Sequence, residues 1–328
     1  MNDPRILCLG EILYDFLADQ PGRPQEQVVS WTPYPGGAPA NVACGLSRLG
    51  TAAGFIGCIG QDKLGTALVQ VLQSAGVNLT GVQLDPDAPT RSVYVTRSAS
   101  GDRSFAGFGN HPTTAFADTR LRAEHLPTPL FEAAEYLVLG TLELAYPDSR
   151  AAIEYALELA DRYYLKVLVD VNWRPVFWPD PAQAPAMIHD LISRADFLKL
   201  SDQEAEWLFQ TTAPAKIVEQ VGSLEGVLVT AGEKGCAYDL AGNQGHVPAF
   251  RVPVQDTTGA GDAFVAGLIH QLCLQGLQGL LYPGTVHSMV RYACAVGALT
   301  TTRPGAIAAQ PTALEVDTFL ASNQLGGK

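Results

Sequence analysis

The residues best suited to chemistry lie at 256–262, in the run Asp-Thr-Thr-Gly-Ala-Gly-Asp, and an apolar stretch follows at 263–269. The apolar stretch predicts a buried helix, whose first turn would carry N–H groups without intrahelical partners and the positive end of the helix dipole. The glycines let a bulky ligand approach the backbone, so this turn is typical of an anion site, most naturally one for phosphate. Because a carboxylate repels phosphate, we interpret Asp262 as a base that takes the proton of a hydroxyl group attacking phosphorus.

An ordinary helix start would also use these residue types. Thr257 or Thr258 would then be the N-cap, and Asp262 would only favour the positive end of the helix. The complete run before a buried helix is more specific than one acidic residue in a first turn. We therefore favour a phosphotransferase site.

A second motif, Pro-Gly-Gly-Ala-Pro-Ala-Asn-Val-Ala, lies at 35–43. Pro39 suits the first turn of a helix, and Gly50 is typical of a C-terminal stop. Between them, apolar residues recur at helical spacing, at Val42, Leu46 and Leu49. The motif is therefore expected to form the start of a second helix.

Asn41 lies off this apolar stripe, so its amide can present both a donor and an acceptor to a cleft. Gly36 and Gly37 permit a tight approach of a ligand or a hinge. An ordinary loop would explain the glycine pair equally well. Together with Asp15, which follows the first predicted strand, these residues indicate a site for a hydroxyl-rich ligand.

The segments G-G-A-P-A-N-V-A at 36–43 and D-T-T-G-A-G-D-A-F at 256–264 resemble the two signatures of the ribokinase-like (PfkB) family of sugar kinases. The resemblance extends over nearly the whole chain and is closest to the fructokinases. Further segments that carry it lie at 55–65, 170–174, 199–204 and 301–306. It implies an ATP-dependent kinase that phosphorylates a primary hydroxyl group of fructose and yields fructose 6-phosphate.

By this resemblance, Asp262 is the base that activates the sugar hydroxyl, and Gly259, Ala260 and Gly261 form the anion hole for the transferring phosphoryl group. Arg174 is a candidate clamp on the nucleotide phosphates or on the sugar, since a planar guanidinium suits anionic oxygens. The alternative for Arg174 is a surface ion pair.

The nucleotide must be bound without a P-loop or a dinucleotide-binding glycine fingerprint, because the sequence contains neither. The loop after the apolar strand at 226–230 matches the adenine and ribose edge of the family, although a plain turn would look the same. Ser201 and Glu204 match the ends of the family's Asn-x-x-Glu motif, which helps to organise Mg²⁺ and phosphate; a solvated helix position is the alternative for Glu204. The expected ATP-binding residues are Ser201, Glu204, Thr230, Gly232, Gly235, Gly259, Gly261 and Cys294.

Two loops resemble the pair that binds a monovalent cation, K⁺, in ribokinase-like enzymes. Their expected cation-binding residues are Asp256, Thr258, Thr300, Arg303, Gly305 and Ala309.

Two departures from the family bear on specificity. Cys294 stands where many relatives place an Asn near the adenine, and the segment 108–113 lacks the Arg-Asn-Pro-Ser-Ala-Asp run usual in fructokinases. Ribose, 2-keto-3-deoxygluconate or a nucleoside such as adenosine therefore remain alternative substrates, and a catalytically silent sugar-binding relative is the alternative from another class.

Length and composition fit a single ribokinase-like domain over all 328 residues. A net charge of -12 argues against nonspecific nucleic-acid binding, which needs clustered Lys and Arg. No apolar run approaches membrane-spanning length, and the N-terminus leads into a strand rather than a signal segment. Six isolated cysteines without a C-x-x-C pattern indicate free thiols in a reducing cytoplasm.

Strands and helices alternate along most of the chain, which predicts an α/β fold with a mostly parallel central sheet flanked by helices on both faces. Ligands in such sheets bind at the carboxyl ends of the strands. Two insertions, at about 14–34 and 88–110, show alternating patterns typical of a small separate β-sheet. By the resemblance, this sheet would be a lid over the sugar, and a homodimer could pair through it.

Overall fold

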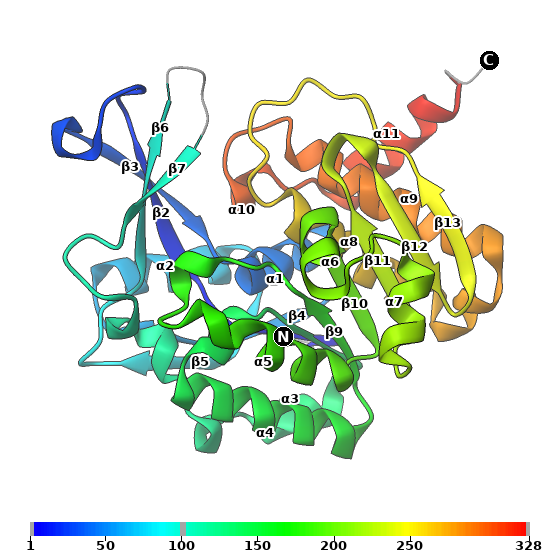
Figure 1. Ribbon diagram of the computed structural model, residues 1–328, viewed down its shortest axis with the longest axis horizontal. Helices are drawn as coiled ribbons and strands as arrows, with labels where there is room; N and C mark the ends of the chain where they lie inside the picture. The colour runs from blue at the N-terminus through cyan, green and yellow to red at the C-terminus, as the bar shows by residue number, and fades with distance from the viewer. Residues whose placement is uncertain (1–2, 99–102, 326–328) are drawn as a thin grey trace.

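A nine-stranded sheet forms the centre of the computed structural model, which describes residues 3–98 and 103–325 (Figure 1). From β11 to β5 its neighbouring strands are parallel, and β12 and β13 add two antiparallel pairs at one edge. In spatial order the strands are β13 (Asn243–Val247), β12 (Cys236–Leu240), β11 (Gly226–Thr230), β10 (Phe197–Ser201), β9 (Lys166–Asp170), β8 (Tyr136–Leu139), β1 (Ile6–Leu9), β4 (Ala53–Gly60) and β5 (Asn78–Asp85).

Helices cover both faces of this sheet, so its central strands are largely apolar. On β1, Leu7 and Leu9 belong to one apolar core, and Ile6 and Cys8 belong to the other. The first core is closed by α3 (Thr128–Ala133), α4 (Pro147–Tyr163), α5 (Ala184–Ser193), α6 (Asp202–Phe209) and α7 (Pro214–Val221). The second is closed by α1 (Ala38–Leu49), α2 (Lys63–Ser74), α8 (Ala260–Gln275), α9 (Pro283–Thr300), α10 (Ala306–Ala309) and α11 (Ala313–Leu325). This arrangement confirms the predicted fold class.

A separate small sheet projects from the main body, at the upper left of Figure 1. Its order is β3-β2-β6-β7, built from β2 (Leu13–Ala18), β3 (Trp31–Gly36), β6 (Ser92–Arg97) and β7 (Arg103–Gly107). Its two faces differ: Asp15 and Leu17 line a pocket shared with the main sheet's loops, whereas the rings of Phe16 and Tyr94 stack on the other face with centroids 5.1 Å apart. The face with Asp15 is therefore the one turned towards the main domain.

The helix that begins at the second motif has the predicted ends. Gly37 precedes it with φ at 105°, Pro39 lies in its first turn, and Gly50 ends it in the left-handed region with φ at 92°. Across the part of the chain that the structure describes, no helix has the length and apolar character needed to cross a bilayer.

Candidate active site

The two sequence motifs meet where α1 and α8 begin. The side-chain Nδ2 of Asn41 donates a hydrogen bond of 2.7 Å to Oδ2 of Asp262. The two helices also pack closely further along, because a Cβ atom built on Gly45 would lie 2.9 Å from Cβ of Ala266. The fold thus brings together two side chains that are 221 positions apart in the sequence.

The environment of Asp262 suits a base. Burial raises the pKa of Asp262, and the hydrogen bond from Asn41 and the charges of Lys199 and Arg174 oppose this rise. A carboxylate with a raised pKa binds a proton more strongly than an ordinary one. The Oδ1 atom of Asn41 is buried and accepts no hydrogen bond from the described residues. The pair therefore offers a proton acceptor beside a second acceptor, which matches a ligand with neighbouring hydroxyl groups.

The chain enters α8 through Gly259, which requires glycine for two reasons. Its φ of 76° lies in the left-handed region, and a Cβ atom at this position would lie 2.7 Å from Cβ of Ala306. No side chain caps this helix start, and the hydroxyl of Thr258 instead donates to Oδ1 of Asp256 over 2.7 Å. The alternative in which Thr257 or Thr258 is the N-cap is therefore wrong.

The backbone N–H groups in the first turn of α8 differ in whether they have a hydrogen-bond acceptor. Ala260 N–H donates back to the carbonyl oxygen of Thr257 over 3.3 Å. For the N–H groups of Gly261 and Asp262 we find no acceptor among residues 3–98 and 103–325, as expected for the start of a helix that binds an anion. Of the predicted set of Gly259, Ala260 and Gly261, only Ala260 thus has an acceptor for its N–H among the described residues, and Asp262 adds a further donor.

A buried ion pair, which the sequence analysis missed, lies beside these donors. Lys199 and Asp170 are 6% and 4% exposed, and Nζ of Lys199 is 2.9 Å and 3.2 Å from the two carboxylate oxygens. Burial raises the pKa of Asp170 to about 6, although the Lys199 charge opposes this shift. A Cβ atom built on Gly261 would lie 3.1 Å from Nζ of Lys199, so the ammonium group lies against the first turn of α8. A lysine inside the apolar strand at 197–201 was the available signal.

Glu204 makes a capping box with Ser201 at the start of α6. Its Oε2 accepts the backbone N–H of Ser201 over 2.7 Å, while the Ser201 hydroxyl accepts the N–H of Glu204 over 3.2 Å. Its Oε1 accepts the backbone N–H of Trp173 over 2.6 Å. Both carboxylate oxygens are therefore used to hold backbone, and Glu204 is a buried side chain rather than the solvated one of the alternative interpretation.

Arg174 follows this held segment and is exposed. Its Nη1 donates to the carbonyl oxygen of Trp173 over 2.9 Å. Its charge also lowers the pKa of Asp262. Neighbouring Asn172 holds this turn with φ at 39°, in the left-handed region that Asn tolerates better than most residues.

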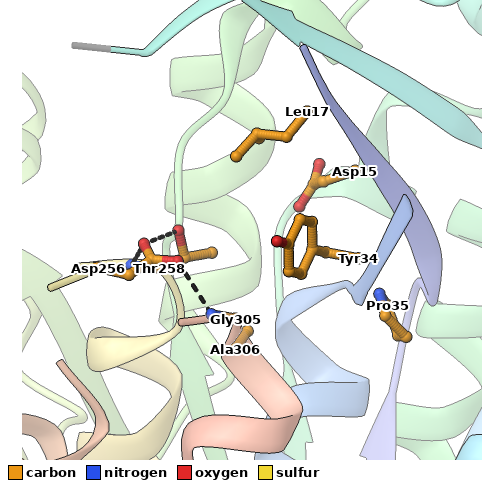
Figure 2. A pocket seen from close by; sticks show the side chains of 8 residues that line it. All are labelled: Asp15, Leu17, Tyr34, Pro35, Asp256, Thr258, Gly305 and Ala306. Carbon is orange, nitrogen blue, oxygen red and sulfur yellow. Dashed lines mark hydrogen bonds between the residues drawn. The ribbon is translucent and has the colours of Figure 1, made fainter. Parts of the chain in front are cut away.

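The small sheet and the loops around α8 and α10 enclose a pocket, shown in Figure 2. Asp15, Leu17 and Tyr34 come from the small sheet, and they face Asp256 and Thr258 across the pocket. Its remaining lining residues are Pro35, Gly305 and Ala306. The predicted sugar residue Asp15 and three predicted cation residues thus line the same pocket.

Asp256 ties the two predicted cation loops together. Its Oδ1 accepts the backbone N–H of Thr258 over 2.9 Å, and its Oδ2 accepts the N–H of Gly305 over 3.0 Å (Figure 2). The carbonyl oxygen of Thr301 in turn accepts the N–H groups of Gln255 and Asp256 over 2.8 Å and 3.2 Å. The loops are therefore linked by backbone as well as by a carboxylate.

The other three predicted cation residues use their side chains elsewhere. The hydroxyl of Thr300 donates to Val296 of its own helix over 2.9 Å. Arg303 forms an ion pair with Glu315. Ala309 is buried at the end of α10. For these residues, only backbone carbonyl groups could serve a cation.

The glycine loop before α1 is tightly packed. A Cβ atom on Gly37 would lie 2.5 Å from the carbonyl oxygen of Glu11, and one on Gly36 would lie 3.1 Å from Oδ2 of Asp15. The carboxylate of Glu11 accepts the N–H of Ala38 over 2.8 Å. Glycine is therefore required at position 37 by close backbone approach as well as by its φ of 105°.

A second buried acidic group lies next to Glu11. A Cβ atom on Gly10 would lie 3.2 Å from both carboxylate oxygens of Glu143, which is 1% exposed. Burial raises the pKa of Glu11 to about 7, and burial and the neighbouring Glu11 raise the pKa of Glu143. The sequence analysis gave no role to either residue.

The predicted adenine edge lies along the ends of β10 and β11. Ser201 pairs with Thr230 in register, and the Thr230 hydroxyl donates to Leu200 over 3.2 Å. Gly235 has φ at 94° and a Cβ atom there would lie 2.1 Å from Val247 O, whereas nothing lies within 4 Å of a Cβ built on Gly232. Burial raises the pKa of the half-buried Cys294 thiol to about 12, so this thiol stays protonated near neutral pH.

The segment 108–113 anchors the base of the small sheet. Arg91, at the entry to β6, is 1% exposed and forms an ion pair of 2.5 Å with Asp118. Its Nη1 also donates to the Thr113 hydroxyl over 3.0 Å, and its guanidinium carbon lies 5.4 Å from the ring centre of Phe108. The segment that departs from the fructokinase run thus packs around a buried arginine.

Residues 3–313 match the family described as pfkB family carbohydrate kinase. Fructokinase-2 of Solanum habrochaites is 36% identical over 321 residues, which are 96% of this chain and 95% of that protein. The crystal structure of a fructokinase with bound ATP from Xylella fastidiosa superposes with a TM-score of 0.87 at 32% identity, covering 97% of this chain and 98% of that one. A fructokinase double mutant from Vibrio cholerae O395 with fructose, ADP and a potassium ion superposes with a TM-score of 0.83 at 28% identity, covering 97% and 98%.

Proposed function

The chain belongs to the pfkB family of carbohydrate kinases, and from this premise we propose that it transfers the γ-phosphoryl group of ATP to a primary hydroxyl of fructose, giving fructose 6-phosphate and ADP. The observation that carries the proposal is the meeting of Asp262 and Asn41 at the uncapped start of α8. A base and amide donors at one helix start are what transfer from a nucleotide to an alcohol requires.

In this proposal Asp262 takes the proton of the attacking hydroxyl, and the amides that begin α8 bind the phosphoryl group. Asn41 binds a sugar hydroxyl through its Oδ1, which accepts no hydrogen bond from the described residues. Asp15, which lines the pocket and lies against Gly36, would bind the sugar together with Gly36 and Gly37. Arg174 would hold an anionic oxygen of the nucleotide or bind the sugar.

ATP would lie along the ends of β10 and β11, against Ser201, Thr230, Gly232, Gly235 and the α9 residue Cys294. Mg²⁺ would neutralise charge on the nucleotide phosphates during transfer. The described residues include no group of three or more His, Cys, Asp or Glu suited to a metal ion. Since both oxygens of Glu204 accept backbone N–H groups, we infer that Mg²⁺ is held chiefly by the phosphates and that Glu204 shapes the loop beside them.

K⁺ would bind at the loops joined by Asp256, with the predicted set of Thr258, Thr300, Arg303, Gly305 and Ala309 supplying mainly carbonyl oxygens. The donor set fits, because carboxylate and carbonyl oxygens suit hard cations.

The small sheet would close over the sugar and exclude water from the reacting groups. We further propose that the whole chain is one domain, that it acts in the cytoplasm, and that two lids pair in a homodimer. Sedimentation tests the dimer, and a monomer at micromolar concentration would reject it.

The function is tested by measuring ADP release and the phosphorylated product with fructose, ribose, 2-keto-3-deoxygluconate and adenosine, each with ATP and Mg²⁺. We expect fructose to give the highest kcat/KM and the product to be fructose 6-phosphate. A higher kcat/KM for another acceptor would overturn the fructose assignment. No sugar-dependent ADP release from folded protein that binds fructose would favour the catalytically silent alternative.

A further inference from the structure

The ammonium group of Lys199 lies against the first turn of α8, which carries the donors of the anion hole. Its Nζ is 3.1 Å from the position of a Cβ atom on Gly261, in the first turn of α8. The N–H groups of Gly261 and Asp262 begin that turn without acceptors among the described residues. An ammonium and an amide N–H are both donors and cannot satisfy each other, so an anion is the natural partner for the three groups.

The ion pair with Asp170 does not use all the N–H donors of the Lys199 ammonium group. Lys199 has three N–H donors, and its hydrogen bonds within the described part of the chain go to the two oxygens of the Asp170 carboxylate. The side chain is 8% exposed, so little solvent reaches the remaining donor. Stability alone does not explain a buried ion pair of this kind, because replacing both partners by apolar residues of similar size often leaves a protein equally stable or more stable. A ligand that uses the third donor explains why the lysine is there.

We propose that Lys199 is a catalytic residue, whose ammonium group, held by Asp170, contacts the phosphoryl group as it passes from ATP to the sugar at the start of α8. The inference rests on the proposed function and adds a side-chain cation to its backbone donors. The bond between the γ-phosphorus and the bridging oxygen breaks, and its electron pair leaves with ADP. The bond from the sugar oxygen to phosphorus forms, and the hydroxyl proton goes to Asp262. Lys199 stays protonated throughout and stabilises charge on the phosphoryl oxygens.

The geometry also assigns a role to Asp170. Lys199 comes from β10 and Asp170 from the end of the neighbouring β9, so the carboxylate holds the ammonium from the sheet side while α8 lies on the other. Asp170 is therefore a positioning residue. A lysine without this carboxylate would be free to rotate away from the phosphoryl group.

The test compares Lys199→Met with wild type and with Lys166→Met. Lys166 is a matched control, because it lies on the adjacent strand β9 and pairs with Asp196 and Glu225, each at 2.7 Å. The readouts are the dissociation constant of ADP alone and that of ADP with aluminium fluoride and fructose, which mimic the phosphoryl group in transit. We expect Lys199→Met to weaken the second by ~10² or more and the first by less than about fivefold, with kcat falling by ~10²–10³. Lys166→Met should change none of these by more than about threefold.

Equal weakening of both complexes would overturn the proposal, because a merely structural role would disturb both. An unchanged aluminium fluoride complex would overturn it as well. If Lys199→Met fails to fold because Asp170 is left unpaired, the double variant Lys199→Met with Asp170→Asn removes both charges and carries the same comparison. A wild type that makes no such complex with fructose would refute the fructose assignment alone, and the same comparison with the acceptor that it does phosphorylate would still decide the role of Lys199.

Discussion

Gly261→Ala should lower kcat with little change in stability, because the added methyl group is compatible with the helix but crowds the ligand. Gly261 does not need a positive φ, and in the first turn of α8 alanine is the better helix former by up to ~1 kcal/mol. Its Cβ atom would, however, lie 3.1 Å from Nζ of Lys199, a tight contact beside the ammonium group that we propose for phosphoryl binding. We expect the free energy of unfolding to change by less than ~1 kcal/mol, while kcat falls by ~10²–10³, the loss typical of one missing oxyanion donor.

The matched control is Gly284→Ala. Gly284 occupies the same second position of its helix, α9, and nothing lies within 4 Å of a Cβ atom built there. This variant should gain up to ~1 kcal/mol of stability with unchanged kcat. Urea denaturation and steady-state ADP release with saturating fructose and ATP give both quantities. A Gly261→Ala enzyme with kcat within about threefold of wild type would refute the reasoning that phosphate approaches this amide.

Three further outcomes are expected. At constant ionic strength, K⁺ should raise the rate above that in Na⁺ if the loops joined by Asp256 bind a cation, and equal rates would count against such a site. Saturating fructose should slow hydrogen exchange of residues 92–97 and 103–107 in the small sheet, and unchanged protection would rule out closure. Glu11 has a pKa raised from 4.5 to about 7, so its contribution to stability is present below about 4.5 and is lost as pH rises through about 7. Burial also raises the pKa of Glu143, so Glu143→Gln removes one of two carboxyls that lose stability as pH rises from about 4.5 and should flatten the fall in urea denaturation, whereas an unchanged slope would contradict the raised pKa of Glu143.

The two motifs and the layered fold could be predicted because they depend on local patterns. The glycine run with an apolar helix after it specifies a helix start, and the alternation of apolar strands with helices specifies a sheet covered on both faces. That Asn41 and Asp262 share a site followed from a resemblance, and their direct hydrogen bond appeared only in the structure.

The contacts that were missed depend on which strands become neighbours and on which backbone groups compete for a side chain. Lys199 and Asp170 meet because β10 pairs with β9, and the spacing of apolar residues does not encode strand order. Glu204 was assigned to metal and phosphate, but the N–H of Trp173, in a loop after another strand, takes one of its oxygens. Ala260 was assigned to the anion hole, but its N–H turns back to Thr257. The first two of these outcomes are set by tertiary contacts, whereas the third is a local turn at the start of α8.

Asp262→Asn tests most directly whether Asp262 is the base that takes the proton of the attacking hydroxyl. Asparagine keeps an oxygen that can accept the hydrogen bond from Asn41, so the fold and the helix start should persist. The matched control is Asp148→Asn, an exposed acidic residue in the first turn of α4. We predict that kcat with fructose falls by ~10² or more in Asp262→Asn, while ATP affinity is kept or improved and the control is unaffected. A purified, folded Asp262→Asn protein that turns over at close to the wild-type rate would contradict the account.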